Sequence, residues 1–149
     1  MSLKLLIVED DPDNACSVRD VATQIGFDVI VADTGEEGVK RFRDETPGVV
    51  LTDLVLPDID GIEVMKRLRQ FDRDTPIIMM TAYGTVESSV RALHAGAYDY
   101  IQKPLNLDDL ESTFRRAAEA SRLRARVDDL TQSVRERHGA RAMVAQSKA

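Results

Sequence analysis

The 149-residue sequence has one cysteine, no tryptophan and no apolar run near the roughly 20 residues that span a bilayer. With Cys16 alone the chain cannot form an internal disulfide, and a reducing compartment suits such a chain. No signal-peptide pattern precedes the first apolar segment. We therefore expect a cytoplasmic protein, and these absences argue against a disulfide-rich secreted domain and against a membrane protein.

A basic surface is also lacking over most of the chain. The formal net charge is −6, and the acids are concentrated in residues 1–114, whereas Lys and Arg exceed Asp and Glu in residues 115–149. An acidic body does not attract the phosphates of DNA. The arginines of the last segment fit the solvated face of a helix, so we expect no direct nucleic-acid binding by this chain.

Short apolar segments alternate with helical patterns along the sequence, which is typical of βα repeats around a parallel sheet. Pro12 suits the first position of a helix that Gly26 ends, and Thr34 with Glu37 fits a capping box. The expected class is α/β. Five strands are predicted, over residues 4–8, 27–32, 48–52, 76–81 and 97–101.

The last helix, beginning at Asn106, has no obvious stop, since no proline or glycine occurs from residue 105 through 138. Leu107, Leu110 and Phe114 are expected to face inward. Four later apolar residues have the spacing of a short coiled-coil seam: Leu123, Val127, Leu130 and Val134. Residues 121–138 are then a linker or dimerising helix, or else a solvated extension. We expect a folded domain over 1–120 and a disordered tail over 139–149.

Chemically active side chains stand where four of the predicted strands end. Parallel strands bring their carboxyl ends to one edge of an open sheet, which is where such folds carry their chemistry. We therefore expect acids, a hydroxyl and an ammonium group to meet there, supplied by Glu9, Asp10, Asp11, Asp53, Thr81 and Lys103.

This set of groups suits phosphoryl transfer. A divalent cation relieves the repulsion between clustered carboxylates, and oxygen ligands favour Mg²⁺, with Mn²⁺ as the alternative. Asp53 is ionised at neutral pH and needs no general base to act as a nucleophile, which would give an acyl phosphate. Thr81 and Lys103 are placed to contact phosphoryl oxygens. Asp11, just before Pro12, fits a helix cap better than a metal ligand.

Four segments resemble the receiver domain of bacterial two-component response regulators. They are VEDD at 8–11, TDLVLPDIDG at 52–61, MTAY at 80–83 and YDYIQKP at 98–104. The resemblance covers about residues 3–120. It implies a flavodoxin-like (βα)₅ three-layer sandwich with strand order 2-1-3-4-5, and a phosphoryl group passed from a histidine kinase to Asp53 with Mg²⁺.

The resemblance also assigns the metal ligands by motif position. Glu9 and Asp10 match the family's acidic pair, Asp53 is the phosphoacceptor and a ligand, and the backbone carbonyl of Val55 matches the third protein ligand. Asp11 is an additional acid next to this pair.

The remaining positions match the family's switch. Thr81 and Lys103 correspond to the phosphate-contacting pair, and the peptide between Lys103 and Pro104 is often cis in this family. Tyr100 stands where the family has its switch aromatic. This implies that phosphorylation draws the Thr81 hydroxyl toward the phosphoryl group, lets Tyr100 turn inward, and changes the surface of the fourth helix, fifth strand and fifth helix.

The stretches 81–87 and 96–100 are most similar to the sigma-54-activator subgroup, of the nitrogen-regulation and dicarboxylate-transport type. In that subgroup a helix like that over 115–138 links the receiver to an ATPase module. No P-loop or helix-turn-helix follows here, so a fragment of a larger regulator and a stand-alone receiver both remain open. The implied partners are a histidine kinase or phosphotransfer protein, and a second copy bound through the helix 4/5 face or the C-terminal helix.

Three other functions compete with this interpretation. A phosphatase of the haloacid dehalogenase kind needs a second Asp where Val55 stands. A flavin or nucleotide protein would carry a Gly-rich loop after the first strand. A scaffold independent of phosphorylation would have no need of the acids, Thr81 and Lys103. We therefore expect a signalling switch that catalyses only its own phosphorylation and dephosphorylation, and not an enzyme acting on other substrates.

Overall fold

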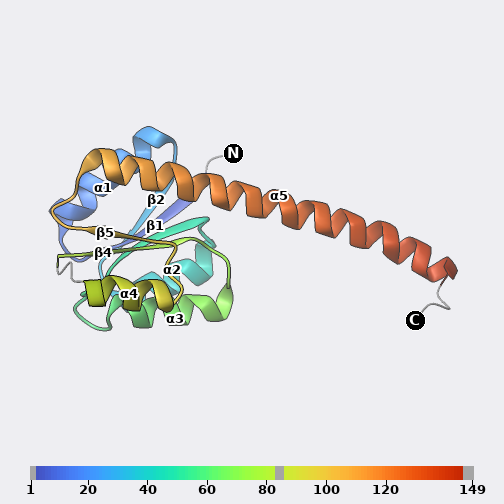
Figure 1. Ribbon diagram of the computed structural model, residues 1–149, viewed down its shortest axis with the longest axis horizontal. Helices are drawn as coiled ribbons and strands as arrows, with labels where there is room; N and C mark the ends of the chain where they lie inside the picture. The colour runs from blue at the N-terminus through green and yellow to red at the C-terminus, as the bar shows by residue number, and fades with distance from the viewer. Residues whose placement is uncertain (1–2, 83–85, 146–149) are drawn as a thin grey trace.

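A single five-stranded parallel sheet lies at the centre of the computed structural model, which describes residues 3–82 and 86–145, without the side chains of 86, 88, 128–129 and 131–145 (Figure 1). The strands are β1 Lys4–Val8, β2 Asp28–Ala32, β3 Val49–Asp53, β4 Ile77–Thr81 and β5 Asp99–Gln102. The helices are α1 Pro12–Ile25, α2 Gly35–Glu45, α3 Gly61–Phe71, α4 Val86–His94 and α5 Leu107–Ala145. The sheet order β2-β1-β3-β4-β5 confirms the expected flavodoxin-like (βα)₅ fold.

Two helical layers cover the sheet, with α1 and α5 on one face and α2, α3 and α4 on the other (Figure 1). The alternation of side chains along β1 shows how both faces are filled. Leu5 and Ile7 join the core cluster beside α1 and α5, whereas Leu6 and Val8 join the cluster beside α2 and α3. All four are fully buried, which explains why the strands read as unbroken apolar runs.

The strand ends differ slightly from the prediction. β3 extends to Asp53, because this residue still pairs with Met80 of β4. β5 begins at Asp99 and not at Ala97, because the chain first completes the turn at Gly96, which has φ 109°, and Ala97 N donates to Ala92 O.

The local start and stop signals operate largely as expected. Asp11 caps α1 by accepting from Asp13 N at 3.0 Å, and Gly26 ends the helix with φ 112°. Thr34 Oγ1 caps α2 by accepting from Glu37 N at 3.1 Å. The reciprocal half of the capping box is replaced by an ion pair of Glu37 with Arg41 at 3.1 Å.

Helix α5 begins at the carboxyl edge of the sheet, runs back across it and projects beyond the opposite edge (Figure 1). Leu110 and Phe114 are buried, and Phe114 meets Phe27 edge to face with ring centroids 5.8 Å apart. The prediction for Leu107 is wrong: it lies in the first turn of α5, and its side chain is 55% exposed.

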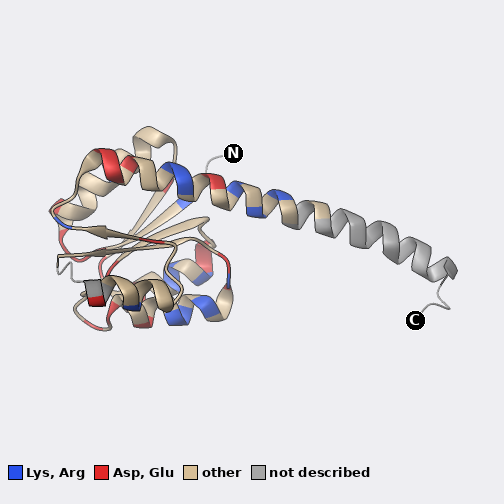
Figure 2. Ribbon diagram, viewed as in Figure 1, with Lys and Arg blue, Asp and Glu red and all other residues tan. Residues whose placement is uncertain are grey.

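Helix α5 continues through Gly139 to Ala145, in a stretch rich in the helix formers Ala and Arg. The expected division into a domain over 1–120, a linker or dimerising helix over 121–138 and a disordered tail over 139–149 stays a prediction. Residues 146–149 lie outside the described chain. Blue bands of Lys and Arg recur along α5 where it leaves the body (Figure 2). In the part of the chain that the structure describes, no helix is both long enough and apolar enough to cross a bilayer.

Candidate functional site

The register of the sheet brings the predicted site residues to one edge. Val8 pairs with Thr52 and Asp53 pairs with Met80, so Glu9 and Asp53 emerge side by side from adjacent strands. The backbone N–H of Glu9 donates to Ala32 O at 3.0 Å. These ladder bonds fix the backbone from which the acids project.

Three carboxylates form a compact cluster at this edge. Glu9, Asp10 and Asp53 each place one carboxylate oxygen within 4.8 Å of the others. Glu9 is 1% exposed and Asp53 6%, whereas Asp10 faces solvent. Glu9 Oε2 is buried and finds no hydrogen-bond donor among the described residues. A buried acceptor left without a donor is a group that a cation can satisfy, so these residues fit a hard divalent ion with oxygen ligands.

Lys103 reaches into this cluster from the end of β5. Its Nζ donates to Glu9 Oε1 at 2.9 Å and to Asp53 Oδ2 at 2.7 Å. Burial by itself would lower the pKa of Lys103, but the hydrogen bonds with Asp53 and then Glu9 outweigh it and raise that pKa. The lysine is therefore a permanent positive charge between two acids. Its backbone N–H donates to Thr81 O at 2.7 Å, and its peptide bond to Pro104 is cis.

The pKa of Glu9 lies above that of an ordinary surface glutamate. Burial, followed by the nearby Asp53, raises the pKa of Glu9 from 4.5 to about 7, although the bond from Lys103 works against the rise. The cluster is thus under electrostatic strain that added positive charge would relieve.

The β3–α3 loop that follows Asp53 is held at its base. Leu54 N donates to Met80 O at 2.7 Å, Gly61 N donates to Leu54 O at 2.8 Å, and Val55 N donates to Asp53 Oδ1 at 3.1 Å. A Cβ at Gly61 would collide with the carbonyl of Asp53 and lie 2.9 Å from Leu54 Cα, so glycine permits this close approach. Val55 is 54% exposed on the loop, and its backbone carbonyl belongs to the segment next to the acids.

Asp11 stays out of the carboxylate cluster. Its two oxygens accept from Asp13 N at 3.0 Å and from Asn14 Nδ2 at 3.2 Å. The structure therefore uses Asp11 as the cap of α1, the role that the sequence favoured.

Thr81 and Tyr100, the two predicted switch residues, lie on the neighbouring strands β4 and β5. Thr81 ends β4 and is fully buried. Tyr100 pairs across the sheet with Met79 and packs, half-buried, against the core on the α2, α3 and α4 side. Tyr83 falls outside the described residues.

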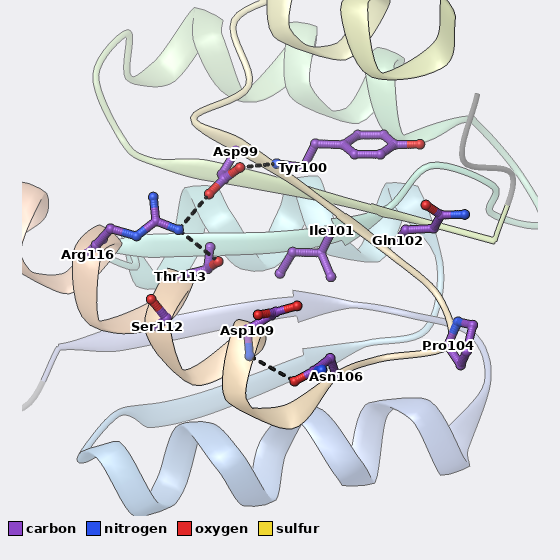
Figure 3. A pocket seen from close by; sticks show the side chains of 10 residues that line it. All are labelled: Asp99, Tyr100, Ile101, Gln102, Pro104, Asn106, Asp109, Ser112, Thr113 and Arg116. Carbon is purple, nitrogen blue, oxygen red and sulfur yellow. Dashed lines mark hydrogen bonds and ion pairs between the residues drawn. The ribbon is translucent and has the colours of Figure 1, made fainter. Parts of the chain in front are cut away.

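A hollow of about 330 Å³ between β5 and α5 was not foreseen from the sequence (Figure 3). In it Arg116 Nη2 donates to Asp99 Oδ2 at 3.1 Å and to Thr113 Oγ1 at 3.2 Å. The ring of Tyr100 lies on the other side of β5, toward the top of Figure 3. No spacing rule links residues 99 and 116, so only the fold reveals this pair. None of the three clustered carboxylates lines this hollow.

Comparisons with known proteins match most of the chain. The family model of the response regulator receiver domain matches residues 5–115. The regulatory protein AtoC of Escherichia coli K12 is 35% identical over 134 residues, which are 89% of this chain and 29% of AtoC. DctD of Pseudomonas aeruginosa, a C4-dicarboxylate transport transcriptional regulatory protein, is 34% identical over 135 residues, 91% of this chain and 29% of DctD.

Among solved structures, NtrX from Brucella abortus superposes with a TM-score of 0.79 at 29% identity, covering 87% of this chain and 30% of that one. The relatives confirm the predicted resemblance, including its dicarboxylate-transport type. The chain spans less than a third of the length of these relatives, at 29% of AtoC and of DctD.

Proposed function

This chain belongs to the response regulator receiver family, and from that premise we propose that it is a phosphorylation-driven switch of a two-component system. Asp53 is the proposed phosphoacceptor. The observation that carries the proposal is the convergence of Glu9, Asp10 and Lys103 on Asp53 from strands that are far apart in the sequence.

The proposed reaction moves one phosphoryl group. A carboxylate oxygen of Asp53 attacks the phosphorus of a phosphohistidine, the new O–P bond forms as the P–N bond breaks, and the released imidazole takes a proton from solvent. Glu9, Asp10, Asp53 and the Val55 carbonyl would hold Mg²⁺, or Mn²⁺ in its place. When bound, the ion supplies charge neutralisation at the phosphoryl oxygens. Lys103, already beside Asp53, contacts another phosphoryl oxygen.

The proposed switch uses the residues behind the site. The Thr81 hydroxyl donates a hydrogen bond to an oxygen of the phosphoryl group. Tyr100 then turns further into the core on the α4 side. Because Tyr100 and the hollow lined by Asp99 and Arg116 share β5, such a movement changes the α4–β5–α5 surface.

The proposed setting is the bacterial cytoplasm, with a histidine kinase or a phosphotransfer protein as the phosphodonor. The altered surface would regulate an output module, which the name of DctD, a transcriptional regulatory protein, suggests is a transcriptional one. Self-association would use the α4/α5 face or the α5 extension, and this chain would make no direct contact with nucleic acid. We propose no turnover of any other substrate.

Intact mass measured after treatment with acetyl phosphate and Mg²⁺ tests the proposal. We expect the added mass of one phosphoryl group, located by peptide mapping to Asp53. Asp53→Asn and chelation by EDTA should both abolish the labelling, whereas Asp44→Asn, at an exposed position on α2, should leave it unchanged. Labelling that persists in Asp53→Asn, or an unlabelled wild type, would reject the proposed phosphoacceptor.

A further inference from the structure

Asp58, in the β3–α3 loop, bonds to a different element of the fold. Its Oδ1 accepts from Gly35 N at 2.8 Å and its Oδ2 accepts from Glu36 N at 2.8 Å. These are the first two residues of α2, and they lie more than twenty positions earlier in the chain. Both carboxylate oxygens are therefore committed to one helix end.

The backbone N–H groups at the N-terminus of α2 find acceptors on two residues, Asp58 and Thr34. The first backbone N–H groups of a helix have no partner within the helix and need acceptors from elsewhere. Thr34, the residue just before α2, accepts from Glu37 N at 3.1 Å through its hydroxyl and from Gly38 N at 3.0 Å through its carbonyl. The N–H groups of Gly35 and Glu36 rely on Asp58, so this helix end and the loop are joined by two hydrogen bonds to a charged acceptor.

Close packing at Gly35 shows independently that the loop is seated on α2. A Cβ at Gly35 would lie 2.5 Å from Ile59 Cγ1 and 2.9 Å from Val64 Cγ2. Contacts that short do not occur between real side chains, so glycine is what lets the α2 backbone approach the loop. Ile59 follows Asp58 directly, and both observations therefore locate the same anchor point.

The anchored loop carries the backbone carbonyl proposed as a metal ligand. Bonds at the base of the loop hold Leu54 to Met80 and Gly61 to Leu54, at 2.7 and 2.8 Å. Between these ends the chain turns through solvent, with Val55 54% exposed and Asp58 also exposed. The bonds from Asp58 to α2 are the long-range hydrogen bonds that this outer part of the loop makes among the described residues.

We propose that Asp58 is a positioning residue for the metal site: by tying the β3–α3 loop to the N-terminus of α2, it holds the Val55 carbonyl where it can complete the coordination of Mg²⁺. The proposal rests on the proposed function, because the metal belongs to that function. Asp58 itself touches neither the metal nor the phosphoryl group.

The electrostatics of the tie agree with this role. Slight burial works to raise the pKa of Asp58, but the backbone N–H groups of Glu36 and Gly35 outweigh it and lower that pKa. A carboxylate at a helix N-terminus is also favoured by the helix dipole. The tie is therefore charged throughout the neutral range and does not depend on a proton.

The test compares Asp58→Ala, Asp58→Asn and Thr34→Ala with the wild type. Thr34→Ala is the matched control, because it removes a side-chain cap from the same end of α2 and leaves the bonds from Asp58 in place. Mn²⁺ is the probe, and the electron paramagnetic resonance signal of the free ion reports the dissociation constant directly.

We expect Asp58→Ala to weaken Mn²⁺ binding about tenfold, as loss of an outer-shell partner does, and Asp58→Asn to weaken it less because one acceptor oxygen remains. Thr34→Ala should bind as the wild type does. At saturating Mg²⁺ the labelling rate of Asp58→Ala with acetyl phosphate should return to that of the wild type, since the defect lies in metal affinity. Hydrogen exchange at Gly35 and Glu36 should accelerate in both Asp58 variants.

Equal Mn²⁺ affinity in Asp58→Asn, Asp58→Ala and the wild type would overturn the inference and leave the proposed function intact. Equal weakening by Thr34→Ala and Asp58→Ala would overturn it too, because general loosening of α2 would then explain both. A wild type that binds no Mn²⁺ would overturn the proposed function and the inference together. Asp58→Asn keeps the shape of the side chain. If Asp58→Ala fails to fold, the Mn²⁺ affinity of Asp58→Asn relative to the wild type still tests the inference.

Discussion

The ammonium of Lys103 lies 2.7 Å from Asp53 Oδ2, so the carboxylate proposed to accept the phosphoryl group is already paired with a fixed positive charge. The same Nζ lies 2.9 Å from Glu9 Oε1. Lys103 therefore offsets the repulsion between two buried acids, and it has a stabilising role in addition to the contact with phosphate proposed for it.

Replacing Lys103 with alanine should destabilise the protein in the presence of EDTA by roughly 2–3 kcal/mol, because two buried carboxylates lose their shared partner. Added Mg²⁺ should restore more stability to Lys103→Ala than to the wild type, since the ion then supplies the missing charge. Thermal denaturation with and without Mg²⁺ measures both effects. Lys66→Ala, at an exposed position on α3, is the control, and an equal Mg²⁺ response in both variants would contradict this prediction.

The free energy of unfolding should depend on pH because Glu9 has different pKa values in the folded and unfolded states. The folded protein raises the pKa of Glu9 from 4.5 to about 7, so between these values the folded state keeps a proton that the unfolded chain has lost. The contribution of Glu9 to stability is therefore fully present below pH 4.5 and is lost as the pH rises through about 7. The total loss is on the order of 3 kcal/mol.

Glu9→Gln isolates this contribution from those of the other acids. Urea unfolding in EDTA from about pH 5 to pH 8 should show the wild type losing stability relative to Glu9→Gln as the pH rises. Above neutral pH the variant should be the more stable protein in EDTA and should gain little from Mg²⁺. Parallel stability curves for the two proteins would refute the raised pKa.

The parallel topology explains how much of the site the sequence could predict. Once the apolar runs are assigned to parallel strands, the residues that follow them must share one edge, and this rule brought Glu9, Asp53, Thr81 and Lys103 together. Local signals such as Asp11 before Pro12 and Gly26 after α1 were also sufficient, because a helix cap depends on only a few neighbouring residues.

Contacts that exposed side chains make with other elements, away from the carboxyl edge of the sheet, could not be predicted. Asp58 with α2, Asp99 with Arg116, and Arg124 with Asp72 all join exposed or half-exposed positions, where no apolar periodicity constrains the pairing. The exposed position of Leu107 has the same origin, since the rotation of α5 against the sheet is set by Leu110 and Phe114 and not by its first turn.

The ion pair of Arg124 with Asp72 should stabilise the packing of the middle of α5 against the loop between α3 and β4. Arg124 Nη2 lies 2.7 Å from Asp72 Oδ2, its Nη1 donates to Thr75 Oγ1 at 3.2 Å, and Thr75 is 1% exposed. Arg69 extends the network by donating to Thr75 O at 2.7 Å and to Gly96 O at 2.9 Å. Because the pair is partly buried and networked, Arg124→Gln should cost about 1 kcal/mol, more than an ordinary surface pair.

A double-mutant cycle of Arg124→Gln with Asp72→Asn, followed by urea unfolding, measures the coupling. Arg122→Gln, on an exposed part of the same helix, should change stability by less than about 0.5 kcal/mol. Burial works to raise the pKa of Asp72, but its bonds to Asp74 N, Thr75 and Arg124 lower it, so this contribution should fade as the pH falls through the acid range. A coupling energy of zero would show that the contact contributes nothing.

The apolar stripe on the α5 extension should mediate self-association that depends on phosphorylation. Leu123, Val127 and Leu130 are 47%, 58% and 61% exposed, spaced four and three apart, on a helix that has left the sheet. Complete burial of a fully exposed apolar side chain gains roughly 1.5–3 kcal/mol, but these side chains are already about half buried, and association itself costs about 4 to 15 kcal/mol. The stripe alone therefore gives a weak dimer, which additional contacts from an altered α4–β5–α5 surface can tip toward the associated or the dissociated state.

Sedimentation equilibrium with and without beryllofluoride, which mimics the phosphoryl group, measures this coupling. The average mass should change on adding beryllofluoride with Mg²⁺, and Val127→Asp should hold the protein at monomer mass in both conditions, because a charge is then placed in the seam. Ala125→Asp introduces the same charge on the opposite side of the helix, where the side chain is also exposed, and should behave as the wild type does. If beryllofluoride leaves the wild-type mass unchanged, α5 association is not coupled to the switch; if Val127→Asp dimerises normally, the stripe is not the contact.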